Sequence, residues 1–99
     1  MTSQEVFEGT LDGPDLTRVL RDIELCADVI EVRVKGGPQD YADANDCSFA
    51  QGSALLRDGR AVGLQIRYRH DGTEWWDTIL RGGGGYRLIR TRVPDLDES

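Results

Sequence analysis

Hydrophobic residues recur every three to four positions in the stretch that follows Asp12, Gly13 and Pro14. This spacing places them on one face of an α-helix, while the charged residues between them face solvent. Asp12 is suited to cap the helix, and proline is tolerated in the first helical turn. The pattern therefore predicts an amphipathic helix that packs on a core through Leu16, Val19, Leu20, Ile23, Cys26 and Ala27.

Residues 29–35 alternate between apolar and charged side chains. Ile30, Val32 and Val34 fall on one side of the stretch, and the residues between them are charged. A period of two is typical of a β-strand with one buried and one solvated face. Residues 4–11 form a weaker candidate strand, because Gly9 interrupts it.

A second, shorter helix is predicted after a polar, turn-rich stretch. Ser48 and Gln51 have the S-x-x-Q spacing of a capping box, in which each residue bonds to the backbone of the other. We expect this helix to run from Ser48 through Leu55 and Leu56 to the Asp58-Gly59 pair.

From residue 61 onward the period becomes two, and three strands are predicted: VGLQIRYRH, EWWDTILR and YRLIRTRV. Asp71 and Gly72 join the first two strands, and this dipeptide is a strong hairpin signal because both residues tolerate positive φ. The predicted element order is β-α-β-α-β-β-β. This order indicates a single α+β domain over residues 1–99, with an antiparallel sheet that ends in a three-strand meander and two helices packed on one face. We expect residues 94–99 to form a disordered acidic tail.

A two-residue turn at Asp71 and Gly72 determines which hairpin side chains share a face, because cross-strand partners point the same way. It places Trp75 on an aliphatic face and Trp76 on a polar one, where Trp76 opposes Arg67. Trp76 is then either a surface partner of Arg67 or an anchor for a binding partner. A bulge at the turn would exchange the faces of the two tryptophans. The aliphatic face carries Leu64, Ile66, Tyr68, Trp75, Asp77 and Ile79, and the polar face carries Gln65, Arg67, Arg69, Glu74, Trp76 and Thr78.

Asp77 does not fit the aliphatic face, because a buried carboxylate is costly unless it is paired. A four-residue loop at 82–85 would place Asp77 opposite Arg90. It would also gather Tyr68, Trp75 and Arg92 at the same end of the sheet. A five-residue loop would break this cluster, and four consecutive glycines carry no information on register. Both registers stay open.

The chain has 99 residues and a formal net charge of −6, which is unevenly distributed. Residues 1–50 hold four basic and eleven acidic side chains, and residues 51–99 hold eight basic and seven acidic ones. The overall acidity argues against a nucleic-acid binder, although a local anion-facing patch remains compatible with it. No stretch of about 18 apolar residues and no signal-peptide pattern is present, so we expect a cytoplasmic protein without a membrane span.

The sequence provides no metal or cofactor motif. Cys26 and Cys47 are too far apart for a CxxC pair, and His70 is the only histidine. We expect Cys26 to be buried on its helix and Cys47 to lie in a loop. The acidic loop with Asp40, Asp43, Asn45 and Asp46 lacks the glycine and glutamate of a calcium-binding loop. We therefore expect no cofactor and no metal.

The leading functional hypothesis is a non-enzymatic interaction module that binds a protein partner or a second copy of itself through the polar sheet face. Its residues are Arg67, Arg69, Glu74 and Trp76, with Arg90 and Arg92 as additions that depend on the register.

The alternative is a small-ligand or catalytic site at one end of the aliphatic face. There Asp77 would serve as acid or base, Arg90 and Arg92 would hold an anionic substrate, and Tyr68 and Trp75 would complete the site. A third hypothesis, that the acidic half mimics nucleic acid, is weakened by the basic residues Arg33 and Lys35 beside Glu31.

Overall fold

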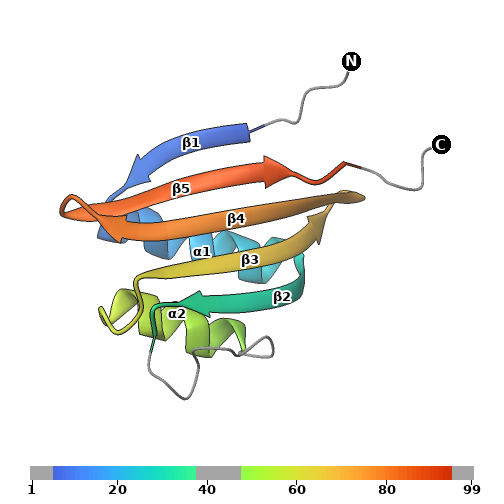
Figure 1. Cartoon of the computed structure of the whole chain (residues 1–99). Helices are drawn as coiled ribbons and strands as arrows, with labels where there is room; N and C mark the ends of the chain where they lie inside the picture. Colours follow the sequence, from blue (N-terminus) through green and yellow to red (C-terminus); the bar gives the residue numbers. More distant parts are fainter. Residues whose placement is uncertain (1–5, 38–47, 95–99) are drawn as a thin grey trace.

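Two helices lie on one face of a five-stranded antiparallel sheet (Figure 1). The computed structural model describes residues 6–37 and 48–94. The spatial order of the strands is β1-β5-β4-β3-β2, so β3, β4 and β5 form the predicted meander and β1 returns to the far edge. The elements are β1 (Val6–Leu11), α1 (Gly13–Cys26), β2 (Asp28–Lys35), α2 (Phe49–Arg57), β3 (Gly63–His70), β4 (Thr73–Gly82) and β5 (Gly85–Arg92).

Both helices begin where the sequence predicts. The Asp12 carboxylate accepts a hydrogen bond of 2.8 Å from the backbone N–H of Asp15, whose own side chain accepts one from the N–H of Asp12. Ser48 and Gln51 exchange the same two bonds at the start of α2. Each capping box satisfies N–H groups that have no partner within the helix.

Two tight turns determine the register of the meander. Asp71 and Gly72 have φ of 53° and 77°, and Gly83 and Gly84 have φ of 62° and 81°. Positive φ at both central residues is characteristic of two-residue hairpin turns whose twist matches that of the flanking strands. The second turn pairs Gly82 with Gly85 and therefore places Asp77 opposite Arg90. Of the two registers that the sequence left open, the protein adopts the one that gathers the cluster.

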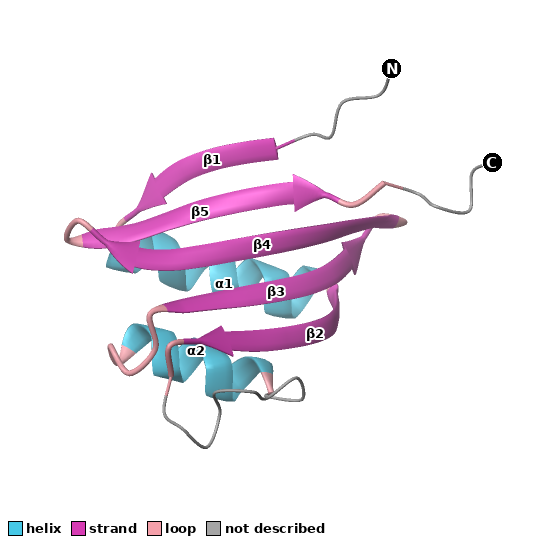
Figure 2. Cartoon of the chain, in the orientation of Figure 1, coloured by secondary structure: helices cyan, strands magenta, loops and turns pink. Residues whose placement is uncertain are grey.

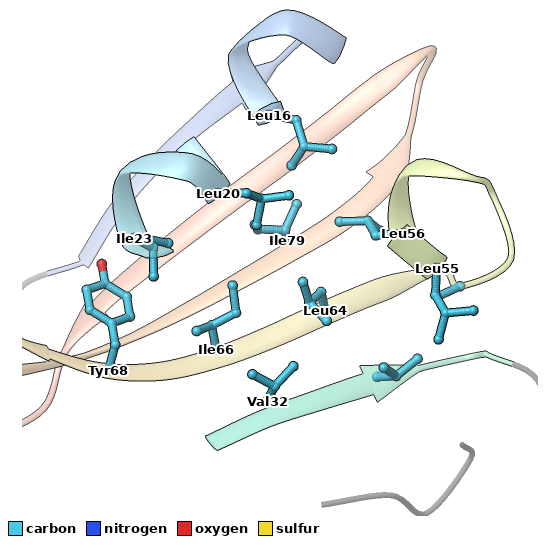
Figure 3. Close-up of a cluster of buried hydrophobic side chains, with 12 residues drawn as sticks. Leu16, Leu20, Ile23, Val32, Leu55, Leu56, Leu64, Ile66, Tyr68 and Ile79 are labelled. Carbon is cyan, nitrogen blue, oxygen red and sulfur yellow. The ribbon is translucent and has the colours of Figure 1, made fainter. Parts of the chain in front are cut away.

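The core lies between the helices and the sheet (Figure 3). Along β3, Leu64, Ile66 and Tyr68 follow one another on the covered face, with Tyr68 at one end of the core. The helices contribute Leu16, Leu20, Ile23, Leu55 and Leu56, and the sheet contributes Val32, Val34, Leu64, Ile66, Tyr68 and Ile79 together with Ala61.

The helices leave one corner of this face uncovered (Figure 2). Helix α1 begins beside Leu11, which pairs with Tyr86, and ends at Cys26, whose carbonyl is bonded to His70. It therefore crosses the sheet diagonally, while α2 contacts β2 and β3. The corner where β1 begins and β5 ends lies away from both helices.

Two expectations about buried side chains were wrong. Ile30 is 47% exposed, because the pairing of β2 with β3 shifts between Val29 and Glu31 and Ile30 has no partner in β3. Such a bulge interrupts the alternation that the sequence pattern assumed. Cys26 is also exposed, because it is the last residue of α1 and no further helical turn shields it.

Several expectations lie outside the described residues: Cys47, the acidic loop with Asp40, Asp43, Asn45 and Asp46, and the tail at 95–99. In the described ranges, no helix combines the length and apolar character needed to cross a bilayer.

Candidate functional site

A cavity of about 460 Å³ lies at the uncovered corner of the sheet. Its size falls within the usual range for small-molecule sites, which is roughly 300–1,000 Å³. Residues of four strands line it, and all of them except Glu8 lie on the face on which the helices pack. The lining residues are Phe7, Glu8, Gly9, Tyr68, His70, Trp75, Leu88 and Arg90.

A buried carboxylate organises the polar side of this cavity. Asp77 has no exposed surface, and its two oxygens accept three contacts from Arg90: 3.0 and 3.1 Å from Nε, and 2.8 Å from Nη2. The Tyr68 hydroxyl donates a further hydrogen bond of 3.1 Å to Asp77 Oδ1. The register places Ile66, Asp77 and Arg90 in one row across β3, β4 and β5. The carboxylate that did not fit the aliphatic face is thus fully paired.

The electrostatics of this cluster keep Tyr68 neutral and Arg90 charged. Burial raises the pKa of Tyr68, and the negative charge of Asp77 raises it further. The hydrogen bond to Asp77 raises the pKa of Arg90 and outweighs the opposing effect of burial. Tyr68 therefore acts as a hydrogen-bond donor, and Arg90 is a cation held in one orientation.

Aromatic and aliphatic side chains form the other walls. The ring centroids of Phe7 and Trp75 lie 6.2 Å apart at an angle of 46°, a tilted arrangement favourable for aromatic pairs. Phe7 is 54% exposed, whereas Trp75 and Leu88 are partly buried against the core. Gly9 lies in the same wall and contributes no side chain.

His70 adds one polar group to the rim. Its Nδ1 lies 3.0 Å from the carbonyl oxygen of Cys26, and because a carbonyl can only accept, Nδ1 carries a proton and donates it. In the neutral ring Nε2 is therefore the acceptor. Nε2 lies 3.7 Å from the Asp71 carboxylate, which is almost fully exposed.

The polar face of the sheet has a different character. Arg67 Nε donates to Glu74, and the Arg67 guanidinium lies 6.0 Å from the centre of the Trp76 ring. Glu74 is also within 3.9 Å of Arg69, and Trp76 is 40% exposed. The hollow between Trp76 and β2 is only about 10 Å³. This face therefore offers little room for a small molecule, and Arg67 and Arg69 are both paired with Glu74.

The candidate residues that the sequence predicted therefore lie on two opposite faces of the sheet. Four of them lie together on the polar face, as the cross-strand pairing after a two-residue turn predicts: Arg67, Arg69, Glu74 and Trp76. Arg90 and Arg92 lie on the opposite face and cannot extend that surface. Arg92 pairs in register with Trp75 and is exposed, but the cavity is lined by Arg90.

The sequence reasoning missed Phe7, Glu8, Gly9, His70 and Leu88 as lining residues. Hairpin parity could have placed His70 beside Tyr68, because both positions lie on the same face of β3. Phe7 and Gly9 required knowing that β1 pairs with β5, which no local pattern reveals.

In the ranges 6–37 and 48–94, no three His, Cys, Asp or Glu side chains come together to hold a metal ion. No protein-family model, curated protein or solved structure matches this chain.

Proposed function

We propose that this protein binds a small molecule in the corner cavity. The observation that carries the proposal is the position of Arg90, which lines a cavity of about 460 Å³ and is held by a carboxylate with no exposed surface. A few polar groups that converge on a largely apolar hollow are the usual composition of a ligand site.

Binding is favoured over catalysis because Asp77 is buried and both of its carboxylate oxygens already accept hydrogen bonds. An acid or base must come within hydrogen-bond reach of a substrate proton. Both oxygens of Asp77 are already bonded to Tyr68 and Arg90, and no part of the residue is exposed. Asp77 therefore serves as a positioning residue for Arg90, and the ligand contacts Arg90 itself.

The two tryptophans provide a direct test. Because they lie on opposite faces, their indole N–H resonances report separately on the cavity and on the polar face. We expect compounds from a fragment library to shift the Trp75 resonance and to leave that of Trp76 in place. A library that shifts neither resonance, or shifts only that of Trp76, would overturn the proposal.

A second function is favoured by the exposure of Trp76. Helices α1 and α2 both lie on the other face of the sheet (Figure 1), and Trp76 beside Arg67 is the kind of residue that dominates interaction hot spots. Under this hypothesis Arg67, Arg69, Glu74 and Trp76 bind a second copy of the chain. Sedimentation velocity at rising concentration should detect self-association that Trp76→Ala abolishes. Leu25→Ala is the control, because Leu25 is 70% exposed on α1. A purely monomeric wild type would contradict this second function.

A further inference from the structure

The donors of Arg90 are only partly used. A guanidinium has five N–H groups, and Asp77 accepts from Nε and from Nη2. Both N–H groups of Nη1 and one of Nη2 therefore remain, and no other residue of the described ranges accepts from them. These remaining donors form the outer edge of the guanidinium, where two parallel N–H groups match the two oxygens of a carboxylate.

The guanidinium is also fixed before any ligand arrives. Its partner Asp77 is completely buried and is bonded to Tyr68 as well, so the arginine is anchored to the core. A donor that is already oriented loses little conformational entropy when a ligand binds. The affinity for a ligand of matching shape is therefore higher.

The charge balance favours a ligand with a single negative charge. Asp77, buried behind Arg90, offsets its charge, and Glu8, the acidic residue among those that line the cavity, is bonded to Arg87. The site thus offers directional donors and little net charge. A planar carboxylate can accept from both parallel N–H groups. The second negative charge of a phosphate ester would add little binding energy, because the site has little net positive charge.

The remaining walls favour a flat apolar body. Phe7, Trp75 and Leu88 present two aromatic rings and one aliphatic side chain around the cavity. Aromatic rings pack well against such walls in tilted or offset geometry. Gly9 adds room, because a Cβ atom at this position would meet nothing within 4 Å.

We infer that the ligand is an aromatic monocarboxylate, whose carboxylate binds Nη1 and Nη2 of Arg90 and whose ring packs against Phe7 and Trp75. This inference rests on the proposed small-molecule function and adds the chemical class of the ligand. The space beside Gly9 accommodates the edge of the ring.

The test compares matched compounds on the full chain. We expect 2-naphthoate to shift the Trp75 indole resonance and to bind at least tenfold more tightly than 2-naphthamide or 2-naphthyl phosphate. Equal affinity of the acid and the amide would overturn the carboxylate assignment while leaving the cavity a ligand site. Tighter binding of the phosphate would overturn it in favour of a phosphate ester. If only non-aromatic fragments shift Trp75, the aromatic assignment fails. If no compound shifts Trp75, the proposed function itself fails.

A cavity-filling variant provides a second readout. Gly9→Val is compatible with a strand backbone and places a side chain in the open space, so it should keep the fold and weaken 2-naphthoate at least tenfold. Thr10→Val is the matched control, because Thr10 is the next residue of β1 and faces the other side of the sheet. Unchanged affinity in a folded Gly9→Val protein would overturn the placement of the ring.

Discussion

Asp77 and Arg90 face each other on neighbouring strands, and two guanidinium nitrogens bond to a carboxylate that has no exposed surface. The pair joins β4 to β5 at the point where the core meets the cavity. Removing one member of a buried ion pair is strongly destabilising, because the other charge is left without a partner. Replacing both members by apolar or neutral groups is often tolerated.

The first prediction is a double-mutant cycle on this pair. We expect Asp77→Asn to lower the free energy of unfolding by about 3–5 kcal/mol, because the guanidinium of Arg90 loses its counter-charge. Adding Arg90→Met in the same chain should recover much of that loss, since residues in contact do not contribute additively. Urea denaturation of the four proteins measures the coupling. A different result would be an Asp77→Asn protein that is more stable than the wild type and shows no coupling to Arg90. The carboxylate would then destabilise the fold, as functional groups often do, and a catalytic role of Asp77 would become the preferred hypothesis.

The second prediction concerns alkaline pH. The pKa of Tyr68 is raised above its ordinary value of 10. The unfolded chain therefore loses this proton at lower pH than the folded chain. The contribution of Tyr68 to stability is fully present below about pH 10 and falls as pH rises toward the folded pKa. In that window we expect the wild type to lose up to about 1.4 kcal/mol per pH unit more than Tyr68→Phe. Urea denaturation at several pH values measures both slopes, and parallel slopes would contradict the burial of the Tyr68 hydroxyl beside Asp77.

The third prediction concerns the two tryptophans. Trp76 is 40% exposed on the polar face, whereas Trp75 is partly buried against the core and Phe7. Acrylamide should therefore quench the fluorescence of the Trp75→Phe variant, which keeps Trp76, more strongly than that of Trp76→Phe. Equal quenching in the two variants is the result that the structure rules out.

The fourth prediction tests the helix that covers the core. Leu20 is 4% exposed and belongs to the buried cluster, and its neighbour Arg21 is exposed. We expect Leu20→Ala to cost about 2–5 kcal/mol of unfolding free energy, because it leaves a cavity. Arg21→Ala should change it by less than about 0.5 kcal/mol. The denaturant midpoints of the two variants compare these effects directly, and similar midpoints would mean that α1 packs on another face.

Local chemistry made much of the fold predictable. The capping residues Asp12 and Ser48 identify the helix starts because their side chains bond to backbone groups three residues away. The Asp71-Gly72 turn predicts the partners across β3 and β4, including Tyr68 with Trp75, because a two-residue loop leaves no choice of register. Part of the candidate site was predictable in the same way. The two-residue turn by itself places Tyr68, Trp75 and Asp77 on one face of the hairpin.

The remaining features depend on contacts between distant parts of the chain. Glycines at 82–85 fit more than one register, so the pairing of Asp77 with Arg90 was decided by the tertiary structure, in which the buried carboxylate gains its partner. The bulge at Ile30 and the pairing of β1 with β5 likewise arise from strand packing.

The hydrophobic pattern by itself determined the order of the elements and the inward face of most of them, because these follow from periods of two and of about 3.6 residues. Only the tertiary structure decided that α1 crosses the sheet diagonally and that β1 brings Phe7 beside Trp75. The cavity lies at the corner of the five-stranded sheet that neither α1 nor α2 covers. No local pattern encodes which corner is left open.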